Sequence, residues 1–160
     1  MSRLSGEQVI QDEDVAYFRG AKDSFAFFNA ADGIDGGQTF YVYDTSTGTK
    51  VFEDSAFFGA MDLPAHAGDI HINRDNGQRL VLTYLRVIAC DCDLTKEVPA
   101  CWERARSDLG IATGTPPTCI RYEGIKEDFW SALAYPVSVG LSEHPQIKAV
   151  DGDVFCWPTD

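Results

Sequence analysis

The sequence has no long apolar run and few basic residues. No stretch approaches the roughly 20 consecutive apolar residues that a membrane-spanning helix needs. Lys and Arg number only 13, against 25 Asp and Glu, so the net charge is −12. Nucleic acids and anionic lipids are bound mainly through basic patches, which such a chain is poor in. We therefore expect no nucleic-acid binding and no membrane insertion, and a protein partner that is basic or neutral.

Motifs of the common enzyme classes are also missing. The chain has no G-x-S-x-G, Walker A or G-x-G-x-x-G sequence. His66 and His71 in "HAGDIH" do not match the H-E-x-x-H zinc motif, and Asp32 and Asp35 in "ADGIDGG" lack the spacing and closing Glu of an EF-hand. We therefore expect no metal, no cofactor and no catalytic residue.

Length and alternation predict a single, mainly β domain over residues 1–160. Hydrophobic residues make up 44% of the chain and charged residues 24%, as is usual for a globular fold. "QTFYVYDTSTGTKVFED" and "DIHINRDNGQRLVLTYLRVIA" each read as strand, turn and strand, turning at Thr47–Gly48 and Asn76–Gly77. We expect an antiparallel meander of blade-like hairpins, with Val42 and Tyr84 in strands.

One or two short helices are expected beside the strands. "VPACWERARSDLG" has Pro99 near its first turn and Gly110 as a stop signal. "GIKEDFWSALAY", residues 124–135, reads as a second short helix that ends before Pro136. In the first helix an apolar stripe at helical spacing should face the core: Cys101, Trp102, Ala105 and Leu109.

The five cysteines are open to three readings: disulfides, buried free thiols, or a metal or catalytic site. The near pair, Cys90 and Cys92, is Cys-x-Cys, whereas zinc sites and redox enzymes favour Cys-x2-Cys. A nucleophilic Cys needs a His partner, and the three His residues form no recognisable motif. Disulfides are therefore favoured, with one thiol left over because the number is odd.

Five cysteines allow fifteen two-bridge frameworks, from five choices of the unpaired residue and three pairings of the rest. We expect Cys92 to pair with Cys101 across a short loop, and Cys119 to pair with Cys156. Disulfides indicate an oxidising compartment. We therefore expect a periplasmic or secreted protein in its mature form, because the start "MSRLSGEQVI" is too polar and short for a signal peptide.

One hairpin carries a resemblance. "FYVYDTSTGTKVFE", about a tenth of the chain, is similar to a strand-turn-strand of a β-propeller blade, where "Y-D-x-x-T-G-x-x-V" is frequent. With its small size, acidity and exported character, the chain resembles the periplasmic immunity proteins that neutralise type VI secretion effectors. That resemblance implies a binding protein, not an enzyme, that plugs the active site of a secreted toxin or hydrolase.

Two loops have the small and acidic residues suited to such a plug, Asn29–Gly37 and Met61–Asp69. Within them, Asp32, Asp35 and His66 are the expected partner-binding side chains. Two other functions remain open at this point. One is a secreted hydrolase with an unrecognised site, and the other is a structural, envelope-associated module.

Overall fold

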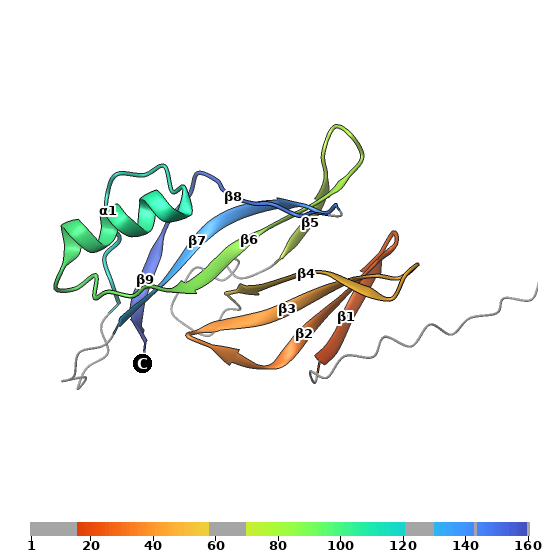
Figure 1. Ribbon diagram of the computed structural model, residues 1–160, viewed down its shortest axis with the longest axis horizontal. Coiled ribbons are helices and arrows are strands. Elements are labelled where there is room, and N and C mark those ends of the chain that lie inside the picture. The colour runs from red at the N-terminus through yellow and green to blue at the C-terminus, as the bar shows by residue number, and fades with distance from the viewer. Residues whose placement is uncertain (1–15, 58–69, 121–129, 143, 160) are drawn as a thin grey trace, which may run out of the picture.

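A computed structural model describes residues 16–57, 70–120, 130–142 and 144–159. These residues form one sheet of nine strands and a single helix (Figure 1). In chain order the elements are β1 Ala16–Lys22, β2 Phe25–Ile34, β3 Gly37–Asp44, β4 Thr49–Ala56, β5 His71–Arg74, β6 Leu80–Ala89, α1 Val98–Leu109, β7 Trp130–Gly140, β8 Ile147–Ala149 and β9 Phe155–Thr159.

The sheet is an antiparallel meander, as the alternation predicts. Its order is β1-β2-β3-β4-β6-β7-β8, with β5 also pairing β6 and β9 also pairing β7. Every pair of strands is antiparallel. The sheet does not close on itself. Val42 lies in β3 and Tyr84 in β6, each in a hairpin, as expected.

The turn between β5 and β6 differs from the expected tight Asn-Gly turn. The amide of Gln78 donates to the carbonyl of Asp75 at 2.9 Å, and the residue with positive φ is Gln78, at 66°. Gly77 does not have positive φ in this structure. The loop is therefore one residue longer than the tight turn, with a left-handed residue after the Asn-Gly pair.

The segment expected to form a second helix is partly strand. Residues 124–129 of that segment lie outside the described residues, whereas 130–135 belong to β7. Ala132, Leu133 and Ala134 are fully buried between β6 on one side and β9 on the other. Sheet pairing on both sides, together with burial, outweighs the helical character of this stretch.

Pro136 lies inside β7 at a position that tolerates it. β9 pairs with residues 130–134 and β8 with residues 137–139, so Pro136 falls between the two. Its carbonyl accepts a hydrogen bond from Val150 at 3.0 Å, so its backbone faces that gap and not β6. The missing N–H of proline therefore removes no ladder hydrogen bond.

A main core lies on one face of the sheet and extends from β2, β3 and β4 across β6 and β7 to α1, which Figure 1 shows beside β7 and β9. The helix has the expected stop, because Gly110 has a φ of 69° and its amide donates to the carbonyl of Arg106. Cys101 and Trp102 are buried, and Ala105 and Leu109 pack against the core, as the stripe predicts. A smaller cluster on the other face surrounds Trp157.

Two disulfides connect these parts, with the pairing expected from the sequence. Cys92 and Cys101 join the segment after β6 to α1, with Cα atoms 5.9 Å apart. Cys119 and Cys156 join the segment after α1 to β9, with Cα atoms 4.3 Å apart. Cys90 is a buried free thiol.

The sheet consists of two halves, β1–β4 and β5–β9, whose strands pair with each other at one narrow junction. Between β4 and β6 the only paired residues are Ala56 and Arg86, followed by a hydrogen bond from the amide of Phe57 to the carbonyl of Leu85 at 2.9 Å. Away from this junction the halves separate, as Figure 1 shows. This separation creates the space described next.

Candidate functional site

A cleft of about 500 Å³ lies between the two halves of the sheet. Its walls come from β1 at residues 19–22, β2 at residues 27–29, Phe40 of β3, and residues 70–72 at the start of β5. This volume is within the range of about 300–1,000 Å³ that is usual for small-molecule sites.

A β-bulge shapes the wall that β1 contributes. The register of β1 against β2 shifts between Phe18 and Gly20, which leaves Arg19 as the extra residue. A bulge bends its strand and changes the direction of the side chains around it. Arg19 lines the cleft as a result, next to Gly20.

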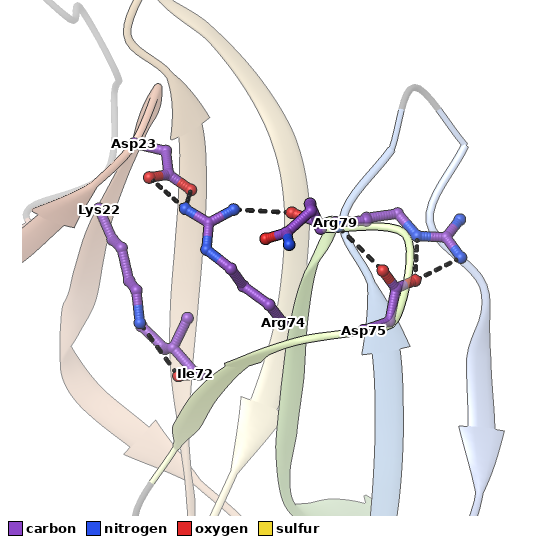
Figure 2. A network of polar contacts seen from close by, with 7 residues as sticks. Lys22, Asp23, Ile72, Arg74, Asp75 and Arg79 are labelled. Atoms are coloured by element: carbon purple, nitrogen blue, oxygen red, sulfur yellow. Dashed lines mark hydrogen bonds and ion pairs between the residues drawn. The ribbon is translucent and has the colours of Figure 1, made fainter.

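Polar contacts between two hairpins bridge one end of the cleft (Figure 2). Lys22 Nζ donates to the carbonyl of Ile72 at 3.2 Å, and Arg74 Nη2 donates to both carboxylate oxygens of Asp23 at 2.7 and 2.6 Å. Arg74 also donates through Nη1 to the carbonyl of Gln78 at 2.7 Å. The β1–β2 hairpin is thereby fastened to the β5–β6 hairpin.

The same view shows an ion pair within the second hairpin. Arg79 donates to Asp75 Oδ2 at 3.1 Å from Nε and at 3.0 Å from Nη2. The backbone amide and then the side chain of Arg79 hold the pKa of Asp75 below its usual value. These contacts fix the β5–β6 loop, which in turn holds Arg74 opposite Asp23.

The lining of the cleft is cationic and aromatic in an acidic protein. Among the described residues, Arg19, Lys22 and His71 line it, and no Asp or Glu does. Asp23, next to Lys22, is engaged by Arg74. The large apolar residues of the described lining are Phe27, Phe28, Phe40, Ile70 and Ile72. Asn29, only 6% exposed, contributes a polar group.

A second polar cluster secures the junction of the two halves. Asp54 of β4 accepts hydrogen bonds from Tyr84 Oη and from Arg86 Nε, the latter at 3.0 and 2.9 Å. Arg86 Nη1 donates to Tyr135 Oη at 3.1 Å. Burial raises the pKa of Tyr84, and the charge of Asp54 raises it further. Tyr84 therefore stays protonated, and the cluster is suited to joining strands.

The outer strand β1 exposes two aromatic side chains. Tyr17 is 60% exposed and Phe18 is 62% exposed. Phe18 stacks edge-to-face on Phe28, and Phe28 on Tyr43, each with ring centroids 5.4 Å apart. Among the described strands β1 pairs only with β2, so within the described part of the chain its other edge is open. We call Tyr17, Phe18 and the open edge of β1 the aromatic edge.

The expected partner-binding residues that the structure describes, Asp32 and Asp35, do not line the cleft, and Asp35 is hydrogen-bonded to β9. The segment 29–37 is the end of β2, a turn and the start of β3, not an open loop. Asp32 is exposed at a second bulge in β2. The carbonyl of Asp35 accepts Trp157 Nε1 at 2.9 Å, and its carboxylate accepts the hydroxyl of Thr159. His66 and the segment 61–69 lie outside the described residues.

Sequence reasoning missed the residues of β1 that the structure brings to the surface and the cleft. A signal was present in "AYFRGAK", which places two aromatic and two basic residues together in an acidic chain. Neither Asp32 nor Asp35 lines the cleft.

No protein family, no curated protein and no solved structure matches this chain. Within the described ranges, no helix has the length and apolar character needed to cross a membrane. The same residues contain no group of three or more His, Cys, Asp or Glu arranged to hold a metal ion.

Proposed function

We propose that this chain is an exported binding protein that inhibits a partner enzyme, in the manner of an immunity protein. The observation that carries this proposal is the aromatic edge, where Tyr17 and Phe18 are more than half exposed. Large aromatic residues are enriched among those that dominate the energy of protein interfaces. An open strand edge also offers backbone groups to a partner strand.

Tyr17 and Phe18 lie on opposite faces of the sheet, because successive residues of a strand alternate. Tyr17 pairs with Asn29, and Phe18 with Phe28. A partner that adds along the edge of β1 therefore meets one aromatic ring on each side of its own backbone.

Charge and covalent structure support the rest of the proposal. A net charge of −12 favours a basic or neutral partner and speeds association with a basic one, an effect that salt weakens. Two disulfides are typical of proteins in oxidising compartments, which supports a periplasmic or secreted location.

The test compares three immobilised proteins: the wild type, a Tyr17→Ser/Phe18→Ser variant, and a Trp130→Ser control. Trp130 is 59% exposed and lies at the start of β7, so its loss removes an exposed aromatic residue outside β1. Proteins retained from source-cell extract are identified by mass spectrometry, and each is assayed with and without the chain.

We expect one enzyme to be retained by the wild type and by Trp130→Ser, and lost from the double variant. Its activity should fall in proportion to the chain added, up to one equivalent. A retained enzyme that keeps full activity in the complex would contradict inhibition. Equal retention by all three proteins would contradict the proposal that the partner binds at the aromatic edge.

Substitutions of Asp32 and His66 test whether the expected loop plug also contributes to binding the partner. Asp32 is exposed, so Asp32→Ala should leave the fold intact, whereas Asp35→Ala would also remove a contact with β9. If a plug operates, Asp32→Ala or His66→Ala should weaken the complex by more than about 1 kcal/mol. A smaller effect from both would leave the aromatic edge as the contact and reject the plug.

A further inference from the structure

We propose that the cleft between the two halves of the sheet binds a small organic anion with a flat apolar body, such as an aromatic carboxylate or sulfonate. Arg19 and Lys22 would hold the anionic group, and the phenylalanines would contact the apolar body. This inference concerns a second site and does not depend on the inhibition of an enzyme.

The size of the cleft fits such a ligand. A volume of about 500 Å³ greatly exceeds the share of roughly 30 Å³ that one water molecule occupies. It is sufficient for a body of two or three fused or linked rings, and it falls in the usual range for small-molecule sites.

The charge of the lining selects an anion. Asp and Glu outnumber Lys and Arg by 25 to 13 in the whole chain, yet none of the described residues that line the cleft is acidic. Arg19 makes no side-chain hydrogen bond or ion pair with other described residues, so its guanidinium is available. A guanidinium matches the two oxygens of a carboxylate in geometry.

Lys22 is positioned to bind the anionic group of the ligand together with Arg19. Its ammonium group donates one hydrogen bond to the carbonyl of Ile72, which fixes the side chain across the end of the cleft. An ammonium group has three protons to donate, so two remain for a ligand. The carboxylate of Asp23 does not compete, because Arg74 binds both of its oxygens.

The apolar lining selects the remainder of the ligand. Phe27 and Phe40 are largely buried and come from neighbouring strands, while Ile70 and Ile72 lie on the opposite wall. A flat ring that enters between the walls gains apolar contact on both faces. Inorganic anions such as phosphate would leave these walls uncovered, so an organic body is required for tight binding.

A second cationic hollow provides a matched control. Arg79, His144 and Lys148 line a space of about 280 Å³ beside β8, and its described lining contains no Phe, Tyr or Trp. Arg79 is also paired with Asp75. Lys148→Gln therefore makes the same change in charge as Lys22→Gln, at a cationic site without the aromatic walls.

The experiment uses two fluorescent probes that differ only in the anionic group. They are 1-anilinonaphthalene-8-sulfonate and its neutral analogue N-phenyl-1-naphthylamine. The oxidised wild type and the variants Arg19→Gln, Lys22→Gln and Lys148→Gln are titrated with each probe. We expect one saturable sulfonate site in the wild type.

Arg19→Gln and Lys22→Gln should each weaken the sulfonate by about tenfold, the change expected for one lost charge-assisted contact. Both should leave the neutral probe within about twofold, and Lys148→Gln should alter neither probe. Arg19→Gln alone suffices if Lys22→Gln perturbs the fold, because the side chain of Arg19 makes no hydrogen bond or ion pair with the rest of the described chain. Equal weakening of both probes, an equal effect of Lys148→Gln, or no saturable binding would overturn the proposal.

Discussion

Gly36 occupies a turn where both its backbone angle and its surroundings exclude a side chain. Its φ is 81°, and a β-carbon there would lie 2.8 Å from Trp157 Nε1. We expect Gly36→Ala to lower the free energy of unfolding by about 3 kcal/mol, roughly 1 from the left-handed angle and the rest from overpacking. Urea unfolding measures this change.

Two other glycines separate these causes. Gly110 has a φ of 69° with no atom near the position of a β-carbon, so Gly110→Ala should cost only about 1 kcal/mol. Gly114 has open space and no positive φ, so Gly114→Ala should be close to neutral. Equal costs at Gly36 and Gly110 would show that the contact with Trp157 is unimportant.

Cys90 should make stability depend on pH at the alkaline end. Burial raises the pKa of its thiol from 9.0 to about 11, with Asp91 adding to the effect and Arg104 opposing it. The folded state therefore binds the proton more tightly than the unfolded state. The protonated thiol therefore stabilises the folded state below pH 9. This stabilisation, roughly 2 to 3 kcal/mol, is lost as the pH rises to about 11.

The measurement is the free energy of unfolding of the wild type and of Cys90→Ala, each across this pH range. Burial also raises the pKa of Tyr84 and of Tyr135, but both proteins share those groups. The difference between the two curves therefore reports the thiol, together with the effect of its charge on Tyr135. Parallel curves would mean that the thiol titrates normally in the folded protein.

At the residue scale, contacts between residues close in the chain were predicted from the sequence, whereas the contacts of Asp35 with distant residues were not. The pairing of Cys92 with Cys101 follows from a short loop between them. Asp35 is different, because Trp157 and Thr159 engage it from more than a hundred positions away. A glycine-rich acidic turn therefore looked like a free loop in the sequence.

At the scale of elements, two ion pairs between described residues join the halves of the sheet, and they should differ in strength. Arg86 and Asp54 pair at the junction with side chains 25% and 8% exposed. Arg74 and Asp23 pair near the surface, 42% and 40% exposed. We expect Arg86→Met to cost about 3 kcal/mol, since it leaves a buried carboxylate unpaired, and Arg74→Met less than about 1 kcal/mol.

Thermal or urea unfolding of the two variants tests this order. Adding Asp54→Asn to Arg86→Met removes the uncompensated charge and should restore part of the loss. No recovery in that double variant would mean that the cost comes from lost packing of the arginine stem and not from charge.

The elements that local patterns specify were predicted, and those that need distant partners were not. The β3–β4 and β5–β6 hairpins are recognisable because alternation and turn residues lie next to each other in the chain. β7 depends on pairing with β6, β8 and β9, and the local sequence instead predicted a helix that ends before Pro136. Its alternating Val137, Ser138 and Val139 were the available signal.

At the scale of the whole molecule, the two disulfides should stabilise the fold unequally. Cys92 and Cys101 are 9 positions apart, and Cys119 and Cys156 are 37 positions apart. Loop-closure entropy gives about 2.5 kcal/mol for the first and about 4 kcal/mol for the second. Replacing each pair by alanine and measuring unfolding in urea checks the order. A larger loss from the shorter loop would show that local strain or packing dominates.

The cleft itself could not be derived from the sequence. Its lining comes from residues 19–22, 27–29, 40 and 70–72, which only the bulge in β1 and the separation of the two halves bring together. Each wall reads locally as an ordinary strand. The net charge of −12 also gave no indication that the described lining of the cleft is cationic.

The buried free thiol has a consequence for how the protein acquires its covalent structure. Cys90 and Cys92 are neighbours along the chain, and either could close a loop to Cys101 with nearly the same entropy. In the folded protein the thiol of Cys90 is buried, and its amide donates a hydrogen bond to the carbonyl of Ser131 in β7. An oxidase that joins cysteines in order of synthesis would trap Cys90 with Cys92. Efficient maturation therefore calls for an isomerase that reshuffles early bridges until the sheet has formed.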